Sequence, residues 1–137
     1  PISAQVPIYP VVDYRGGTPS SERYAKGYGI LEGDTVDWFR NHYFANAADM
    51  DDWRAAPHLA ESHANLPPAL IITAECDVLR DEGVNYSKQL SEAGNAVEHV
   101  EYKGVVHGFF GYLGLVDEAE QAHQKVADYL NGIWGRG

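Results

Sequence analysis

Residues 69–110, ALIITAECDVLRDEGVNYSKQLSEAGNAVEHVEYKGVVHGFF, decide the fold. An apolar, β-branched run at residues 69–74 predicts a buried strand of a parallel sheet. A polar helical pattern follows at residues 81–93 and stops at Gly94, a residue that readily takes the left-handed conformation of a helix C-terminus. Residues 97–102 predict a second strand. Strand, helix and strand together form a βαβ unit, in which the two strands are parallel.

Two ionisable side chains come directly after these two predicted strands. Asp77 follows the first strand, and His107 lies on a glycine-flanked loop after the second. The strands of a βαβ unit end at the same edge of the sheet, where functional groups of open α/β folds lie. We therefore expect Asp77 and His107 to meet. An aspartate and the histidine that it orients are two of the three residues of a nucleophilic triad.

The residues around these positions resemble a known family. The run ECDVLRDEG at residues 75–83, followed by HGF at residues 107–109, resembles the C-terminal half of the hormone-sensitive-lipase-like esterases, which belong to the α/β-hydrolase superfamily. That family has an Asp-Pro-Leu-Arg-Asp-Glu-Gly run that begins with the catalytic acid, and a His-Gly-Phe that carries the catalytic base. The segments LPPAL at residues 66–70 and IYP at residues 8–10 also resemble the family.

The resemblance implies an α/β fold. Residues 1–137 would form the C-terminal part of a single α/β-hydrolase domain, with a mostly parallel sheet of about three strands and flanking helices. Asp77 would be the catalytic acid and His107 the general base. Asp81 and Glu82 are rivals for the acid, but both fall in the first turn of a helix, where carboxylates usually cap backbone donors. Asp81 remains the alternative to Asp77.

The nucleophile of this superfamily lies in Gly-x-Ser-x-Gly and precedes the acid and the base in the chain. Residues 1–137 contain neither this motif nor the His-Gly-Gly run that supplies oxyanion donors. The apolar segment at residues 2–12 is interrupted by two prolines, and in the family it follows the nucleophile's strand and helix. The chain is therefore expected to be a fragment that lacks the nucleophile-bearing N-terminal half and has no esterase activity alone.

Residues 13–29 and 45–66 predict irregular connections. Between them, residues 35–44 predict an amphipathic helix, with Asp34 as its cap. In the related esterases the corresponding helix lines the acyl pocket, which makes Thr35 and Phe39 candidate pocket residues. A buried core position for Phe39 is the alternative. A last helix is predicted over residues 117–134, with one apolar stripe that packs on the sheet.

The composition limits the class of protein. A length of 137 residues fits one domain, and no apolar run is long enough for a membrane span. The balance of 20 acidic against 10 basic residues argues against nucleic acid as a partner. Cys76 is the only cysteine, which excludes an internal disulfide and favours a reducing, cytoplasmic location. It is interpreted as a small packed residue and not as a nucleophile.

The resemblance predicts hydrolysis of a carboxylic ester by a Ser-His-Asp triad, of which this chain supplies Asp77 and His107. No metal or organic cofactor is implied. The expected partners are a small-molecule ester and the missing N-terminal half. The exposed edge of the strand predicted at residues 2–12 also predicts a homo-oligomer. The alternative function is a non-catalytic small-molecule-binding protein on a hydrolase scaffold.

Overall fold

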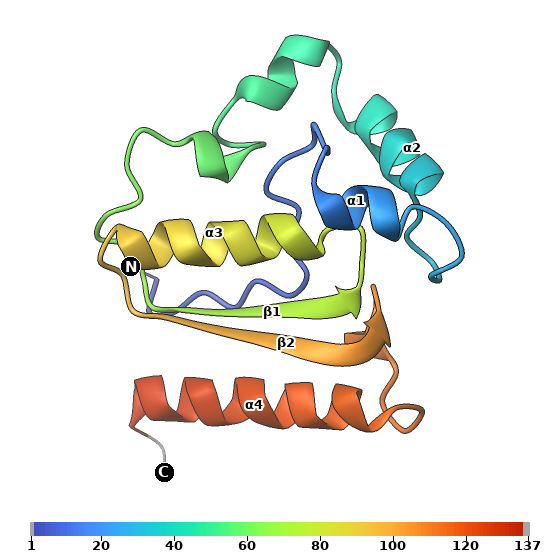
Figure 1. Cartoon of the computed structure of the whole chain (residues 1–137). Coiled ribbons are helices and arrows are strands. Elements are labelled where there is room, and N and C mark those ends of the chain that lie inside the picture. Colours follow the sequence, from blue (N-terminus) through green and yellow to red (C-terminus); the bar gives the residue numbers. More distant parts are fainter. Residues whose placement is uncertain (1, 136–137) are drawn as a thin grey trace.

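The computed structural model describes residues 2–135. Two parallel strands, β1 (Ala69–Cys76) and β2 (Val97–Val106), are joined by helix α3 (Arg80–Glu92). Helix α3 lies on one face of the strand pair, and α4 (Asp117–Trp134) lies along the other (Figure 1). The predicted βαβ unit is confirmed, and the chain folds as three layers with the sheet in the middle.

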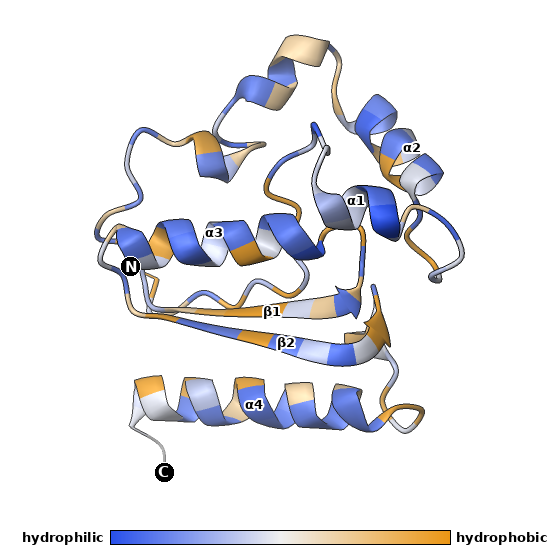
Figure 2. Ribbon diagram, in the orientation of Figure 1, coloured by the Kyte–Doolittle hydropathy of each residue, from blue (hydrophilic) through white to orange (hydrophobic). Residues whose placement is uncertain are grey.

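Strand β1 is buried on both faces because helices cover both. Successive side chains of a strand point to opposite faces. Leu70 and Ile72 pack toward α4, in a cluster with Ala122, whereas Ile71 packs with Leu90 of α3. The first part of β1 is coloured as hydrophobic in Figure 2, as expected for a strand that is buried on both faces.

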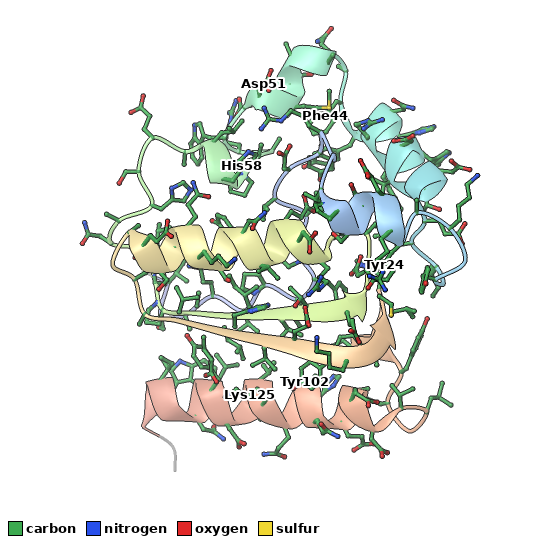
Figure 3. The ribbon with its side chains drawn as sticks, in the orientation of Figure 1. Tyr24, Phe44, Asp51, His58, Tyr102 and Lys125 are labelled. Atoms are coloured by element: carbon green, nitrogen blue, oxygen red, sulfur yellow. The ribbon has the colours of Figure 1, made fainter. Side chains whose placement is uncertain are left out.

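The second strand contributes mainly to the layer between the sheet and α4. Its buried Tyr102 lies between β2 and α4 (Figure 3) and belongs to the same cluster as Phe109, which comes just after the strand. Strand β2 extends to Val106, beyond its predicted end at Tyr102. Gly104 adopts a φ of 71° there, and the register with β1 shifts between Ala74 and Cys76. This irregular pairing lets the strand continue past the glycine.

Residues 2–12 run beside β1 but pair with it only in part. Gln5 and Ile8 form isolated parallel bridges to β1. Pro7 and Pro10 have no N–H to donate, so a continuous ladder cannot form across them. The predicted sheet of about three strands therefore consists of two continuous strands and a third, interrupted segment.

Two short-range details differ from the prediction. Helix α2 (Gly33–Tyr43) has Glu32 at its N-cap, so the prediction of Asp34 as the cap is wrong, because Asp34 already lies inside the first turn. Helix α1 (Pro19–Arg23) lies in a region predicted to be irregular. The side chain of Thr18 caps α1, and proline begins it, a combination that favours a helix start.

Within residues 2–135 the remaining regular elements are three short 3₁₀ helices, η1 (Ala47–Asp51), η2 (Pro57–Leu59) and η3 (Phe109–Gly111). The first two lie in the long connection before β1, which was predicted to be irregular. The bounds of α4 agree with the predicted helix at residues 117–134. Across residues 2–135, no helix combines the length and the apolar character that crossing a membrane requires.

Candidate active site

Asp77 and His107 meet at the carboxyl edge of the sheet. Asp77 directly follows β1, and His107 directly follows β2. Cys76 of β1 pairs with Val106 of β2, so the residues that follow them, Asp77 and His107, lie next to each other. The Nδ1 atom of His107 lies 2.8 Å from Oδ2 of Asp77. The predicted contact between the two side chains is therefore present.

The Asp77 carboxylate is shielded from solvent and serves as an acceptor on both oxygens. Its side chain is 0% exposed. Its Oδ1 accepts a hydrogen bond from the backbone N–H of Leu79 at 2.9 Å, and its Oδ2 faces the histidine. An ionised carboxylate only accepts, so Nδ1 of His107 carries the proton of this contact. In the neutral ring, Nε2 is then the unprotonated nitrogen, as a general base requires.

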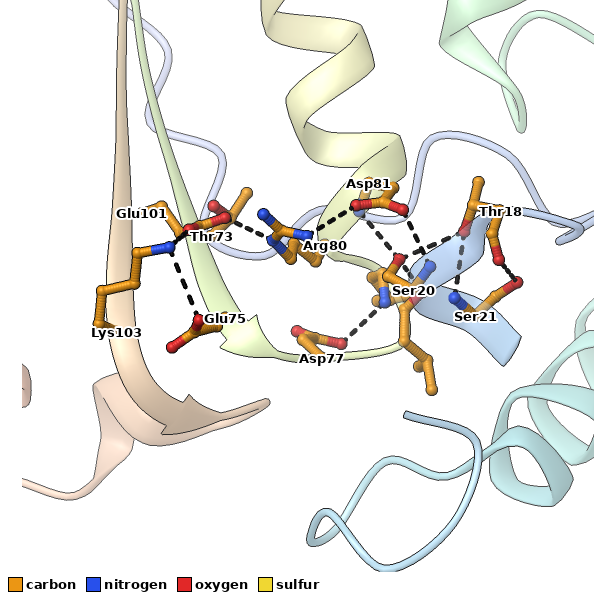
Figure 4. Close-up of polar contacts among 12 residues, drawn as sticks. Thr18, Ser20, Ser21, Thr73, Glu75, Asp77, Arg80, Asp81, Glu101 and Lys103 are labelled. Carbon is orange, nitrogen blue, oxygen red and sulfur yellow. Dashed lines mark hydrogen bonds and ion pairs between the residues drawn. The ribbon is translucent and has the colours of Figure 1, made fainter. Parts of the chain in front are cut away.

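The rival acid Asp81 has a different partner. Its carboxylate accepts a hydrogen bond from the backbone N–H of Ser20 at 2.9 Å, and its own N–H donates to Oγ of Ser20 at 3.0 Å. The Ser20 hydroxyl in turn donates to the backbone oxygen of Val78 at 3.1 Å. Figure 4 shows Asp81 turned toward Ser20, with Asp77 on the other side of the turn. Asp81 thus ties α1 to the start of α3, and Asp77 is the acid beside His107.

The other rival, Glu82, is a buried carboxyl with an unusual environment. Only 7% of the residue is exposed, and burial raises its pKa to about 8. Its Oε2 accepts a hydrogen bond from the backbone N–H of Asp13 at 3.1 Å, and its Oε1 has no hydrogen-bond partner among the described residues. Sequence reasoning predicted a helix-capping carboxylate here. It missed the burial, because the segment that covers Glu82 lies far away in the sequence.

His107 also lines a cavity of about 230 Å³. Tyr14 and Asp13 contribute to its wall, but most of the lining side chains are apolar. These apolar residues are Val11, Leu31, Val36, Phe39, Tyr43 and Leu79. The cavity therefore places an apolar space directly against the imidazole ring.

Of the two predicted pocket residues, Phe39 lines this cavity and Thr35 does not. Val36, Phe39 and Tyr43 share one face of α2 because they are spaced by three and four residues. Thr35 precedes Val36 by one position, which turns it about 100° around the helix axis. Phe39 is 53% exposed, so the alternative of a buried core position is wrong.

Tyr9 contacts the imidazole, and sequence reasoning missed this residue. The centroids of the Tyr9 and His107 rings are 4.3 Å apart, with the ring planes tilted by 55°. The bridge between Ile8 and Ile72 sets Tyr9 beside β1, from where its ring reaches His107. A signal was present, because Tyr9 belongs to the IYP run that resembles the family. No side-chain pattern indicated which way the ring would point.

Cys76 lies next to Asp77 in the sequence and is partly buried. Burial raises the pKa of its thiol, and the neighbouring Glu75 raises it further. A raised pKa disfavours the thiolate, which is the nucleophilic form of cysteine. The structure thus supports the interpretation of Cys76 as a packed residue.

A family model described as alpha/beta hydrolase fold matches residues 1–111. The chain belongs to this family. It is 40% identical over 126 residues to an ethyl acetate hydrolase of Pseudomonas putida, a match that covers 92% of this chain and 39% of the relative. It is also 36% identical over 110 residues to an arylesterase of Saccharolobus solfataricus, covering 80% of this chain and 36% of that protein.

A solved structure agrees with these matches. A hyperthermophilic esterase from the archaeon Pyrobaculum calidifontis superimposes with a TM-score of 0.92 at 38% identity, covering 96% of this chain and 44% of that chain. The α/β-hydrolase fold and the resemblance to hormone-sensitive-lipase-like esterases are confirmed. The chain spans about two fifths of the length of the relatives that it matches.

Proposed function

We propose that this chain is the acid- and base-bearing part of a serine esterase. The observation that carries the proposal is the hydrogen bond between Nδ1 of His107 and the buried carboxylate of Asp77, at the sheet edge where α/β folds carry function. This contact leaves Nε2 of His107 as the base. Asp77 holds the imidazole in the correct tautomer and stabilises the imidazolium that forms.

The reaction would proceed in two halves. Nε2 of His107 accepts the proton of a serine hydroxyl while the serine oxygen attacks the ester carbonyl. The protonated imidazole then gives this proton to the leaving alcohol, which produces an acyl-enzyme. In the second half a water molecule takes the place of the alcohol. Nε2 accepts a proton from the water, the acid is released, and the serine is restored.

We place the serine in polypeptide outside these 137 residues. The chain contains no Gly-x-Ser-x-Gly, and the relatives are more than twice as long as the region that they share with it. Superfamily order puts the nucleophile before the acid and the base. The N-terminal part of the same domain would then lie beside the interrupted segment at residues 2–12, whose outer edge β1 does not cover. A second copy of the chain is the alternative occupant of that edge.

The cavity beside His107 favours esters with a small apolar group. Its volume of about 230 Å³ is below the range of about 300–1,000 Å³ that accommodates drug-sized ligands. Two relatives are named ethyl acetate hydrolase and arylesterase, after esters with small or flat apolar groups. A short acyl chain, or a single aromatic ring, would suit this space.

The test uses the full-length protein and p-nitrophenyl acetate as the substrate. We expect His107→Ala and Asp77→Asn each to lower kcat by about 10³–10⁴-fold, because loss of the base or of the correct tautomer disables the nucleophile. The matched control is His42→Ala, which removes a histidine on the exposed face of α2 and should leave kcat within about twofold. Saturable ester binding without turnover by the unmodified protein would instead support the non-catalytic binder.

A further inference from the structure

The backbone of Tyr9 is held in an unfavourable conformation. Its φ is 36°, in the left-handed region that bulky side chains rarely adopt. Pro10 follows it, and the residue before a proline normally prefers an extended conformation. The N–H of Tyr9 donates to the backbone oxygen of Ile72 in β1 at 2.7 Å, which holds the strained residue on the sheet. Such outliers persist where the surroundings enforce them, and they cluster at functional sites.

In this conformation the Tyr9 ring contacts both the candidate base and the core. The ring meets the imidazole of His107 at 4.3 Å between centroids. It also meets Phe109, which is almost fully buried, at 6.1 Å and 61°. Burial raises the pKa of Tyr9, and the nearby Asp77 raises it further, so the ring stays a neutral phenol at physiological pH.

The hydrogen bond to Asp77 fixes only one atom of the His107 ring. A ring held by its bond to Cβ and by one hydrogen bond at Nδ1 can still tilt about these two points, which displaces Nε2. A neighbouring ring packed at 55° to the imidazole restricts this tilt. The edge contact with the buried Phe109 limits the movement of the Tyr9 ring itself.

We propose that Tyr9 is a positioning residue, whose ring holds His107 so that Nε2 keeps a constant place at the cavity. The proposal rests on the proposed esterase function and deepens it. The strained backbone fits this role, because it lets the ring project from the strand end onto the imidazole. A glycine would adopt the same φ without strain but would offer no ring.

The test compares variants of the full-length protein that distinguish the effect of the Tyr9 ring from the effects of its hydroxyl and of its volume. Tyr9→Phe keeps the ring, and Tyr9→Leu keeps apolar bulk without a flat ring. We expect Tyr9→Phe to retain kcat within about twofold. Tyr9→Leu should lower kcat by about 10–100-fold with KM nearly unchanged, because small displacements of a catalytic group cost rate and not ground-state binding.

A spectroscopic signal tests the positioning independently of turnover. The Nδ1 proton that His107 shares with Asp77 should give a sharp downfield ¹H NMR resonance in the unmodified protein and in Tyr9→Phe. It should broaden or disappear in Tyr9→Leu, while the melting temperature of each variant reports on folding. If Tyr9→Leu does not fold, Tyr9→Asn takes its place, since asparagine tolerates a positive φ and also lacks the ring.

Two results would overturn the proposal. One is a ring-free variant that folds and keeps both kcat and the downfield resonance. The other is a Tyr9→Phe variant that loses as much kcat as Tyr9→Leu, which would make the hydroxyl the important group. Failure of the esterase proposal would look different, because the unmodified protein would then not turn over esters. The NMR comparison would still decide whether Tyr9 orders the imidazole.

Discussion

Helices α3 and α2 both border the candidate site, but the protein holds them in different ways. Helix α3 has five buried residues, of which Tyr86 and Leu90 pack against β1, and it begins just after the loop that carries Asp77. Helix α2 buries none, and its aromatic side chains Trp38, Phe39 and Tyr43 are more than half exposed. The comparison indicates a division of tasks. The α3 side holds the loop of the candidate acid Asp77, and the α2 side forms one wall of the cavity.

The largest expected difference is in stability. Leu90→Ala should lower the free energy of unfolding by about 2–5 kcal/mol, because Leu90 is fully buried between α3 and β1 and leaves a cavity. The matched change on α2, Trp38→Ala, should cost about 0.5 kcal/mol or less, since that ring is largely exposed. Urea denaturation of the full-length protein measures both values. Equal losses would show that α2 is as firmly packed as α3, against the comparison.

Glu82 of α3 makes a prediction about pH. Its pKa is about 8 in the folded protein, raised from 4.5, so between these values the folded state binds more protons than the unfolded state. Stability therefore falls as pH rises from about 5 to 8 and levels off above pH 8. The full shift corresponds to ~5 kcal/mol. This is the upper limit of the loss, because water that reaches the ionised carboxyl lowers its cost.

The variant Glu82→Gln keeps the shape of this side chain and cannot ionise. Thermal denaturation at pH 5 and pH 9 should show that it removes most of the difference between the two pH values. The control is Asp81→Asn, which changes a carboxylate in the same helical turn but should leave the slope with pH in place. An unchanged slope in Glu82→Gln would mean that another group causes the pH dependence.

The smallest expected effect concerns the cavity wall on α2. Phe39→Ala should lower kcat/KM for an apolar ester by about tenfold, mainly through KM, because it removes apolar contact beside His107. Stability should change little, since Phe39 is mostly exposed. Thr35→Ala, on the same helix but off the lining face, should leave kcat/KM within about twofold. A stronger effect at Thr35 than at Phe39 would reverse the assignment of the lining face.

The sequence was sufficient for the parts of the site that depend on local patterns and on one topological rule. The strand and helix signals of residues 69–110 predicted the βαβ unit, and parallel strands that end at one edge brought Asp77 and His107 together. The length of α4 followed from its apolar stripe. In each case the deciding residues lie close together in the sequence, or the connection has a fixed handedness.

The parts that could not be predicted depend on how residues 2–15 pack against segments far along the chain. The ring of Tyr9 meets His107, and the backbone of Asp13 reaches Glu82, across long stretches of sequence. The choice between Thr35 and Phe39 depended on the rotation of α2 about its axis, which an exposed helix with aromatic residues on several faces leaves undetermined. The resemblance suggested both residues, and the rotation of α2 places Phe39 but not Thr35 in the cavity wall.

The reciprocal hydrogen bonds between Ser20 and Asp81 have a consequence for protein engineering. They fasten α1, which precedes α2 in the chain, to the start of α3, so this junction does not depend on α2. Residues 33–43 therefore form a module whose aromatic face can be randomised for new ester specificity while the candidate pair Asp77 and His107 is left unchanged. Libraries confined to that module should retain a high proportion of folded members.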